Sequence, residues 1–229
     1  MLLKRSVIIV AGGSGTRMKS DIPKQFLLLN GLPVLMHSVN AFRKFDPSVQ
    51  IVIALPHACY SLWDTLCLKY NFLAKHELAP GGESRVQSVK NALALVPDKG
   101  YTAIHDGVRP LVSEETIRKA FYEAELFGNA VPFIPVNESV RKTEGTSNMP
   151  VPRDTLYIIQ TPQVFKTGLI KKAYSLLETN DFTDDATILE TIGEKIHLFE
   201  GNRENIKITY PSDLLLAEAL LGSLTGNKK

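Results

Sequence analysis

The amino-acid sequence has little cysteine and no recognisable metal-ligand spacing. Only two of its 229 residues are cysteines, Cys59 and Cys67, and they do not form a C-x-x-C motif. The sequence therefore lacks the cysteine pattern of a disulfide-stapled secreted domain or a structural zinc site. Among the histidines, His76-Glu77 leads to Pro80, where a zincin needs a second histidine. A reducing compartment, the cytoplasm, is the expected location.

Long hydrophobic runs and a strong net charge are also missing. The apolar run Val7–Ala11 has five residues and ends in glycines, too short for a signal peptide or a membrane span. A formal net charge of +2 is too close to neutral to indicate binding to nucleic acid or to a membrane surface, so neither is expected as a partner. Residues 1–30 nevertheless carry a local excess of positive charge, which favours an anionic ligand near the N-terminus. The charged residues there are Lys4, Arg5, Arg17, Lys19 and Lys24 against Asp21.

What the sequence does contain is an alternation of strand-like and helix-like segments. With 44% hydrophobic and 22% charged residues it has a globular composition, and residues 1–229 are expected to form one domain. The alternation predicts an α/β fold, with a mostly parallel sheet between two layers of helices. The expected strands are Val7–Val10, Gln50–Leu55, Tyr101–His105, Ala130–Ile134, Ile196–Glu200 and Asn205–Thr209. The expected helices are Val34–Phe42, Tyr60–Tyr70, Arg85–Val96, Ser113–Phe127, Leu169–Leu177, Asp184–Ile192 and Leu214–Leu221.

One polar, turn-rich segment, residues 137–154, interrupts this alternation. A structureless loop of that length is unusual in a compact domain, so a projecting β-hairpin arm is expected. The arm has two interpretations. It is either a surface excursion without a role, or an oligomerisation arm that brings Arg141 or Arg153 to the site of another subunit.

The first chemical motif is VIIVAGGSGTRM, residues 7–18, in which an apolar strand leads into a glycine-rich loop. Glycines after a strand let backbone N–H groups approach a phosphate closely. Met18 occupies the position of the last glycine of a dinucleotide-binding fingerprint, and no Gly-Lys pair gives a Walker A loop. With Arg17 inside the loop and Lys24 soon after it, the motif favours a triphosphate cradle over a tight turn with solvated charges.

A second motif, GGESRVQS at residues 81–88, opens an amphipathic helix. Ser84 and Gln87 have the spacing of a capping box, and Ser84, Arg85 and Ser88 share one helix face. These side chains either face a ligand cleft at the positive end of the helix or only cap it.

Asp106 is placed at the carboxyl end of an expected central strand, where ligands bind in parallel sheets. A carboxylate there binds Mg²⁺ or orients a sugar hydroxyl, unless it only pairs with Arg109. Further along the chain, Lys207 alternates with Ile206 and Ile208, so it points away from the face that they bury, as an anion ligand or as a solvated charge. Asp184 and Asp185 follow Thr183 at a helix start and are expected to be caps.

Taken together, these motifs resemble the 2-C-methyl-D-erythritol 4-phosphate cytidylyltransferases of isoprenoid precursor synthesis. AGGSGTRM with PKQF, GGESRVQSV, HDGVRP, QTPQVF, TDDA and NIKIT occur in the order of that family, from about Val7 to about Ala219. The resemblance implies a homodimer of nucleotidyltransferase (Rossmann-like) sheets, with a β-arm that completes the neighbouring subunit's site. It also implies transfer of CMP from CTP to 2-C-methyl-D-erythritol 4-phosphate, with release of pyrophosphate and with Mg²⁺ or a similar ion.

The resemblance carries site roles onto matching positions of this sequence. It implies catalytic roles for Arg17, Lys24 and Lys207. It implies contacts to CTP from Ala11, Gly12, Gly13, Gly15, Gly82, Glu83, Ser88, Asp106 and Gly107. It implies contacts to the acceptor from Asp106, Ser139, Arg153, Thr161 and Lys207, with Asp106 also near the metal. The arm departs from the family, since NESVRK replaces the usual pattern and PVPRD around Arg153 resembles the ribitol 5-phosphate cytidylyltransferases, which leaves ribitol 5-phosphate as an alternative acceptor.

The chemistry implied by this resemblance explains why no catalytic histidine is expected. A phosphate monoester is largely dianionic at neutral pH, so it attacks the α-phosphorus of CTP without a general base. The task of the protein is then to align two anions and to neutralise their charge. Two other classes remain open. A nicotinamide-dependent oxidoreductase also begins with a strand, a glycine loop and a helix, and a non-catalytic nucleotide-binding regulator keeps the loop without needing Lys207.

Overall fold

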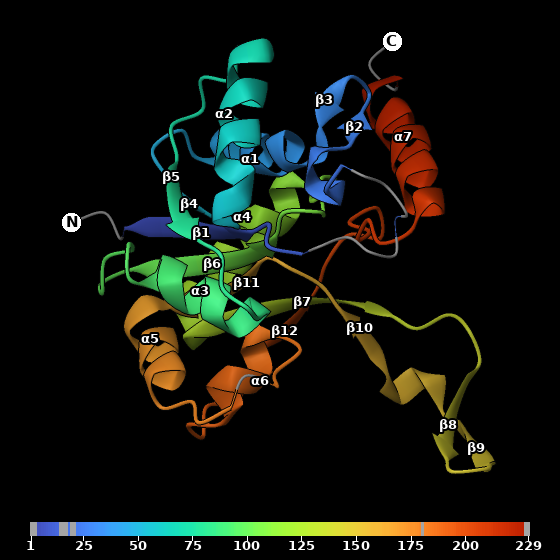
Figure 1. The fold of residues 1–229 in the computed structure, drawn as a ribbon. Coiled ribbons are helices and arrows are strands. Elements are labelled where there is room, and N and C mark those ends of the chain that lie inside the picture. The colour runs from blue at the N-terminus through green and yellow to red at the C-terminus, as the bar shows by residue number, and fades with distance from the viewer. Residues whose placement is uncertain (1–3, 14–17, 19–21, 180, 227–229) are drawn as a thin grey trace.

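A central mixed sheet organises the computed structural model, which describes residues 4–13, 18, 22–179 and 181–226. Seven strands run in the order β10-β7-β11-β6-β1-β4-β5, and β12 pairs with the other side of β7 at one end (Figure 1). Neighbours β6, β1, β4 and β5 are parallel, whereas β11 lies antiparallel between β6 and β7. The strands are β1 Arg5–Val10, β4 Gln50–Leu55, β5 Glu77–Pro80, β6 Tyr101–Asp106, β7 Asn129–Pro135, β10 Tyr157–Ile159, β11 Gln163–Lys166 and β12 Leu198–Glu200.

Helices cover both faces of this sheet. On one face lie α1 Val34–Phe45, α2 Tyr60–Lys69 and α4 Glu114–Phe127, and on the other lie α3 Arg85–Leu93, α5 Thr167–Ser175 and α6 Asp185–Glu190 (Figure 1). The period of two in β1 explains the two cores: Val7 and Ile9 pack with α1 and α4, while Ile8 packs with α3 and α5. The α/β fold with three layers and a mostly parallel sheet, expected from the sequence, is confirmed.

A third apolar cluster lies beside the main sheet. Helix α7, Pro211–Gly226, covers Leu29, Val34 and Ile208 through Ala217. The short elements between β1 and α1 belong to this region: the 3-10 helix η2 (Lys24–Phe26) and the strands β2 (Leu28–Leu29) and β3 (Leu32–Pro33). The 3-10 helix η3 (His57–Cys59) precedes α2. None of the helices within the described ranges is both long and apolar enough to cross a membrane.

Local sequence signals place most helix ends correctly. Helix α4 is capped by Ser113, whose Oγ accepts the Thr116 N–H at 3.0 Å, and it ends at Gly128 with φ of 87°. Helix α3 begins as expected, but it ends at Leu93 rather than at Val96, because Pro97 disfavours helical backbone in the residue before it.

The expected strand Asn205–Thr209 is wrong. This segment has no strand partner, and its backbone bonds are scattered: Ile208 N–H donates to the Val108 carbonyl, while Asn205 N–H donates to the carbonyl of Asn202. Its side chains nevertheless alternate in direction without any strand pairing, since Ile208 is fully buried and Lys207 points to the opposite side. Three strands of the main sheet, β5, β10 and β11, and the short strands β2 and β3 have no counterpart in the expected set.

Residues 137–154 form the expected projecting hairpin. Strand β8, Val140–Glu144, pairs antiparallel with β9, Ser147–Val151, across a turn in which Gly145 has φ of 59°. The hairpin extends away from the body of the molecule, and the 3-10 helix η4, Arg153–Thr155, leads back to β10 (Figure 1). All side chains from Arg141 to Pro150 are exposed, so within one chain the arm has no core of its own.

Candidate functional site

The loop after β1 lines a hollow at the carboxyl end of the parallel strands. Two hydrogen bonds fix the backbone of Ala11. The Ala11 N–H donates to the Ala54 carbonyl at 2.9 Å, and Gln25 Nε2 donates to the Ala11 carbonyl at 2.8 Å. Lys24 is buried in η2, and its Nζ donates to the Ile208 carbonyl at 3.1 Å. The loop, η2 and the C-terminal segment therefore meet here. Gly15 and Arg17 lie outside the described residues.

The start of α3 forms the opposite wall of this hollow. Ser84 caps the helix by accepting the Gln87 N–H at 3.0 Å, while Ser88 Oγ accepts the Gly82 N–H and donates to the Ser84 carbonyl, both at 2.9 Å. A Cβ on Gly82 would lie 2.5 Å from Gln87 Cβ, so this close turn requires glycine. The expected cap is confirmed, although the Gln87 side chain donates to Asn91 instead of returning to the turn.

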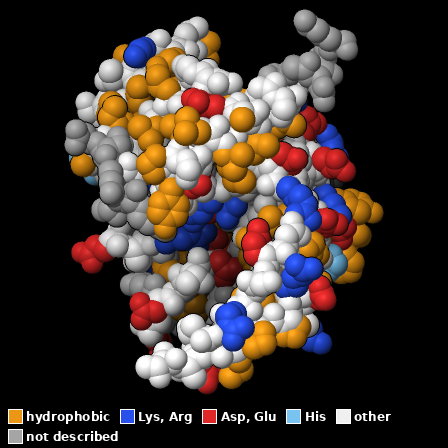
Figure 2. Space-filling view, turned by 90° about the vertical axis from the view of Figure 1, so that its right-hand side faces the viewer, with side chains coloured by type: hydrophobic (Ala, Val, Ile, Leu, Met, Phe, Trp, Pro, Cys, Tyr) orange, Lys and Arg blue, Asp and Glu red, His pale blue; other side chains and the backbone are white. Residues whose placement is uncertain are grey.

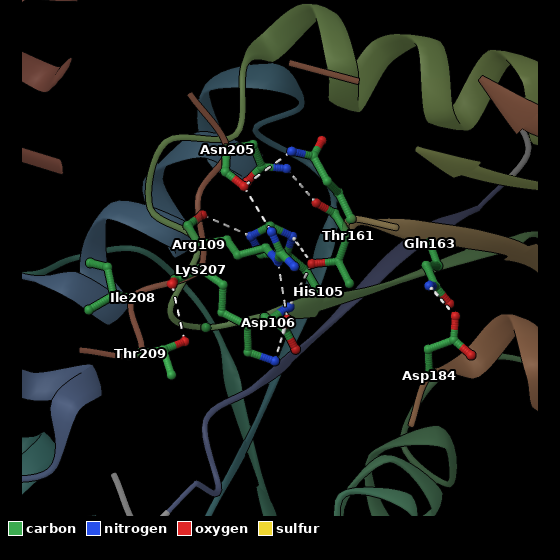
Figure 3. A network of polar contacts seen from close by, with 12 residues as sticks. His105, Asp106, Arg109, Thr161, Gln163, Asp184, Asn205, Lys207, Ile208 and Thr209 are labelled. Carbon is green, nitrogen blue, oxygen red and sulfur yellow. Dashed lines mark hydrogen bonds and ion pairs between the residues drawn. The ribbon is translucent and has the colours of Figure 1, made fainter. Parts of the chain in front are cut away.

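Asp106, at the end of β6, gathers three cations. Its Oδ2 lies 3.0 Å from Lys207 Nζ and 3.1 Å from Arg109 Nε (Figure 3). Its Oδ1 lies 3.9 Å from Arg85 Nε. Burial opposes ionisation of Asp106, but the charges of Lys207, Arg85 and Arg109 outweigh it and hold its pKa well below the ordinary value. The pairing of Asp106 with Arg109 is therefore present, together with an ion pair to Lys207. Binding of a metal or of a sugar hydroxyl by Asp106 stays a prediction.

A buried hydrogen-bond chain lies behind Asp106. The Asp106 N–H donates to Thr161 Oγ1 at 3.0 Å, Thr161 Oγ1 lies 3.1 Å from His105 Nδ1, and His105 Nε2 lies 3.1 Å from the Arg109 carbonyl (Figure 3). Asn205 adds a bond from its Nδ2 to the Thr161 carbonyl at 2.8 Å. These bonds tie the end of β6, the turn after it and the residues before β11 into one unit.

Arg85, the first residue of α3, connects this cluster to α6 in the same layer of helices. Its guanidinium binds both carboxylate oxygens of the fully buried Asp185, at 2.9 and 2.6 Å. Tyr174 Oη donates to Asp185 Oδ1 at 2.5 Å, and burial, followed by the charge of Asp185, raises the pKa of Tyr174. Asp184 is the helix cap, as expected, since its Oδ1 accepts the Thr187 N–H. The expectation that Asp185 is a cap is wrong, because its carboxylate instead neutralises Arg85.

Two adjoining hollows meet at this cluster. The loop hollow, of about 410 Å³, is lined by Ala11, Gly12, Gly13, Lys24, Gly82, Glu83 and Ser88, among others. The strand hollow, of about 440 Å³, is lined by residues around β11 and α6, including Gln160, Thr161, Gln163, Thr183 and Thr187. Arg85, Asp106 and Lys207 line both hollows. On the face that Figure 2 shows, Lys and Arg side chains gather around a central depression, with acidic side chains among them.

The remaining site candidates lie at different distances from these hollows. Gly107 lines neither, and a Cβ there would lie 3.1 Å from the Val10 carbonyl, so close packing explains this glycine. Ser139 and Arg153 are exposed on the arm, and Arg153 Nη1 donates to the Asn137 carbonyl at 2.6 Å. Within one chain, neither arm residue lines the hollows that contain Thr161 and Lys207.

Within the part of the chain that the structure describes, Asp106 is the one carboxylate that lines both hollows. Among the described residues, no group of three or more His, Cys, Asp or Glu side chains is placed to hold an ion. A single carboxylate fits a Mg²⁺ ion that binds mainly through substrate phosphates and water. The donor set therefore fits a metal that arrives with a nucleotide better than a resident metal.

Comparison with known proteins gives the same interpretation of the fold. Residues 6–223 match the family model described as 2-C-methyl-D-erythritol 4-phosphate cytidylyltransferase. The chain belongs to this family. A relative of that name from Bacteroides thetaiotaomicron is 49% identical over 219 residues, which cover 96% of this chain and 100% of the relative. A second, from Syntrophus aciditrophicus, is 36% identical and covers 93% of this chain and 94% of its own length.

Solved structures show the same architecture. The 2-C-methyl-D-erythritol 4-phosphate cytidylyltransferase of Thermus thermophilus is 31% identical, with a TM-score of 0.77 and coverage of 96% of this chain and 98% of its own. The 4-diphosphocytidyl-2C-methyl-D-erythritol synthase of Anaerococcus prevotii is 26% identical, with a TM-score of 0.82 and coverage of 96% of both chains. The family and fold implied by the sequence motifs are confirmed.

Proposed function

We propose that this protein transfers CMP from CTP to 2-C-methyl-D-erythritol 4-phosphate and releases pyrophosphate. The observation that carries the proposal is the meeting of two hollows at Lys207 and Asp106, one behind the glycine loop and one beside β11. The family match supplies the reaction class. Two substrates that bind in these two hollows would bring their reacting groups together at the shared residues.

The loop hollow is proposed to hold CTP. Its backbone N–H groups at Gly12 and Gly13 suit phosphate oxygens, and Lys24 adds a fixed positive charge. Ala11, Gly15 and Arg17 are proposed as further parts of the triphosphate site, on the strength of the family motif. Gly82, Glu83 and Ser88, at the start of α3, are proposed to contact cytosine and ribose.

The strand hollow is proposed to hold the acceptor, with Thr161 and Asp106 at its wall and Lys207 between the two substrates. An oxygen of the acceptor phosphate forms a bond to the α-phosphorus of CTP. The bond from that phosphorus to the bridging oxygen breaks, and the electron pair leaves with pyrophosphate. No proton is removed from the attacking dianion, so the site needs positive charge rather than a base. Lys24, Lys207 and Arg17 are proposed to supply it.

Asp106 is proposed to help hold a divalent cation, Mg²⁺ or a similar ion, that would arrive with CTP. When bound, this cation supplies further neutralisation of phosphate charge. Lys207 already lies 3.0 Å from Asp106, so the same residue both orients that carboxylate and faces the proposed reaction centre.

We also propose a homodimer in which the arm completes the neighbouring subunit's site with Ser139 and Arg153. The exposure of the whole hairpin supports this, because a β-hairpin without a covering layer gains little from folding alone. Mixing Arg153→Ala chains with Lys24→Ala chains tests it. If the arm acts in the neighbouring subunit, mixed dimers should regain activity that neither variant has. Exchange of subunits without any regained activity would contradict the arrangement.

Pyrophosphate release tests the proposed reaction directly. The assay contains Mg²⁺ and CTP, with 2-C-methyl-D-erythritol 4-phosphate, ribitol 5-phosphate or no acceptor, and with ATP, GTP or UTP replacing CTP in parallel. We expect turnover with CTP and methylerythritol phosphate. Preference for ribitol phosphate would assign the alternative acceptor, which the sequence around Arg153 favours. Binding of CTP without release would instead identify a nucleotide-binding regulator. The two free cysteines, Cys59 and Cys67, are compatible with the proposed cytoplasmic location.

A further inference from the structure

His105 is completely buried beneath the strand hollow and has no part in the proposed chemistry. It is the residue before Asp106 in β6, and its two ring nitrogens contact two different segments, Thr161 and the Arg109 carbonyl (Figure 3). Phe42 packs against the ring from the other side, in an edge-on contact with ring centres 5.1 Å apart. The ring is therefore held in one orientation.

The directions of these hydrogen bonds follow from chemistry. A carbonyl oxygen only accepts, so His105 Nε2 carries the proton that is donated to the Arg109 carbonyl. The ring is fully buried and its Nδ1 faces a hydroxyl group rather than a carboxylate, so the neutral ring, with no proton on Nδ1, is the form that fits this site. Nδ1 must then accept from the Thr161 hydroxyl. The Thr161 oxygen in turn accepts the Asp106 N–H at 3.0 Å.

We propose that His105 is a positioning residue for acceptor binding, which acts by holding the Thr161 hydroxyl and, through it, the end of β6 at Asp106. The inference rests on the proposed function. Thr161 and Asp106 line the strand hollow, whereas His105 does not. Because the Thr161 hydroxyl donates to Nδ1 and accepts from the Asp106 N–H, both its proton and its oxygen are held in place. Loss of the Nδ1 contact frees the hydroxyl to rotate and loosens the wall on which the acceptor binds.

Two substitutions separate the two contacts of the ring. In His105→Asn, the side-chain oxygen takes the position of Nδ1 and can accept from Thr161, while the contact to Arg109 is lost. In His105→Gln, the side-chain nitrogen takes the position of Nε2 and can donate to the Arg109 carbonyl, while the acceptor for Thr161 is lost. Both variants remove the imidazole and perturb its packing against Phe42, so each serves as the control for the other.

We expect His105→Gln to raise KM for the acceptor about tenfold, the typical effect of one lost positioned hydrogen bond. KM for CTP should rise less than KM for the acceptor, because Asp106 lines both hollows whereas Thr161 lines only the strand hollow. His105→Asn should keep KM for the acceptor close to that of the unchanged protein. Equal effects of the two substitutions on the acceptor, or an equal rise of KM for CTP, would overturn the proposal.

A double-mutant cycle tests whether His105 acts through Thr161. In a Thr161→Val background, His105→Gln should cause no further rise of KM for the acceptor, because the hydroxyl that it positions is already gone. Additive effects would show that His105 acts by another route.

Nitrogen NMR of the His105 ring tests the hydrogen bond without any turnover. Nδ1 should be unprotonated near neutral pH, and Thr161→Val should shift its resonance much more than that of Nε2. An unchanged Nδ1 resonance would refute the contact. Absence of turnover in the unchanged protein with either acceptor would instead refute the proposed function, and the acceptor role of His105 with it. Normal turnover with indistinguishable Gln and Asn variants refutes the inference alone.

Discussion

The ion pair between Arg85 and Asp185 gives the sharpest test of how the site is supported. Asp185→Asn keeps the shape of the side chain but removes its charge, which leaves the guanidinium of Arg85 without its principal counter-ion. Removing one partner of a buried pair typically costs about 3–5 kcal/mol of unfolding free energy. Arg85 is 23% exposed and keeps Asp106 at 3.9 Å, so we expect a loss at the lower end of that range, about 3 kcal/mol.

Urea unfolding followed by circular dichroism measures this loss. Glu190→Gln is the matched control, since it removes a carboxylate from the same helix α6 at an exposed position and should change stability by less than about 0.5 kcal/mol. Tyr174→Phe removes one bond to the charged carboxylate and should cost about 1.5–3 kcal/mol. If Asp185→Asn cost no more than the Glu190 control, the buried pair would not hold α3 and α6 together as argued.

Three further outcomes are expected. Lys24→Ala or Lys207→Ala should lower turnover about 10²–10³-fold, as for loss of a transition-state charge donor, while the exposed Lys69→Ala should not, in a pyrophosphate-release assay. The pKa of His105 is about 6.5 in an unfolded chain, and burial lowers it to about 4 in the folded protein. The free energy of unfolding should therefore fall by up to about 3 kcal/mol as the pH drops from about 6.5 to about 4. In pH-dependent unfolding, His105→Asn should reduce this slope. Ser113→Ala should lower stability by about 1 kcal/mol in urea unfolding, through loss of the α4 cap.

The fold was largely predictable from local patterns, whereas the contacts of the site were not. The alternation of strands and helices, the cap at Ser113 and the hairpin all follow from periodicity and turn residues, which act over a few positions. Strand β11 was missed because its four residues, Gln163–Lys166, directly follow Pro162 and begin and end with polar side chains. Its position between β6 and β7 depends on tertiary pairing, which single-sequence periodicity does not encode.

Contacts between distant segments explain the site residues whose roles the sequence does not predict. Asp185 looks like a helix cap in the sequence, and its partner Arg85 lies one hundred positions away. The role of Asn205, which bonds to the Thr161 carbonyl, likewise depends on two distant segments meeting. Lys207 was placed correctly for a different reason, because burial of Ile208 alone fixes the direction of its neighbour even outside a strand. The roles of these residues in binding and catalysis stay predictions.

The ion cluster at the junction of the two hollows has a consequence for which anions the protein retains. Three cationic side chains there, Arg85, Arg109 and Lys207, already contact the carboxylates of Asp106 and Asp185, so the resting cluster carries a net charge of only +1. A single inorganic phosphate must compete with Asp106 for Lys207, so its binding should be stabilised only slightly. A triphosphate offers several negative charges at once and, bound as proposed, would also contact the glycine loop. We therefore expect the paired carboxylates to weaken binding of small anions more than binding of polyvalent ligands.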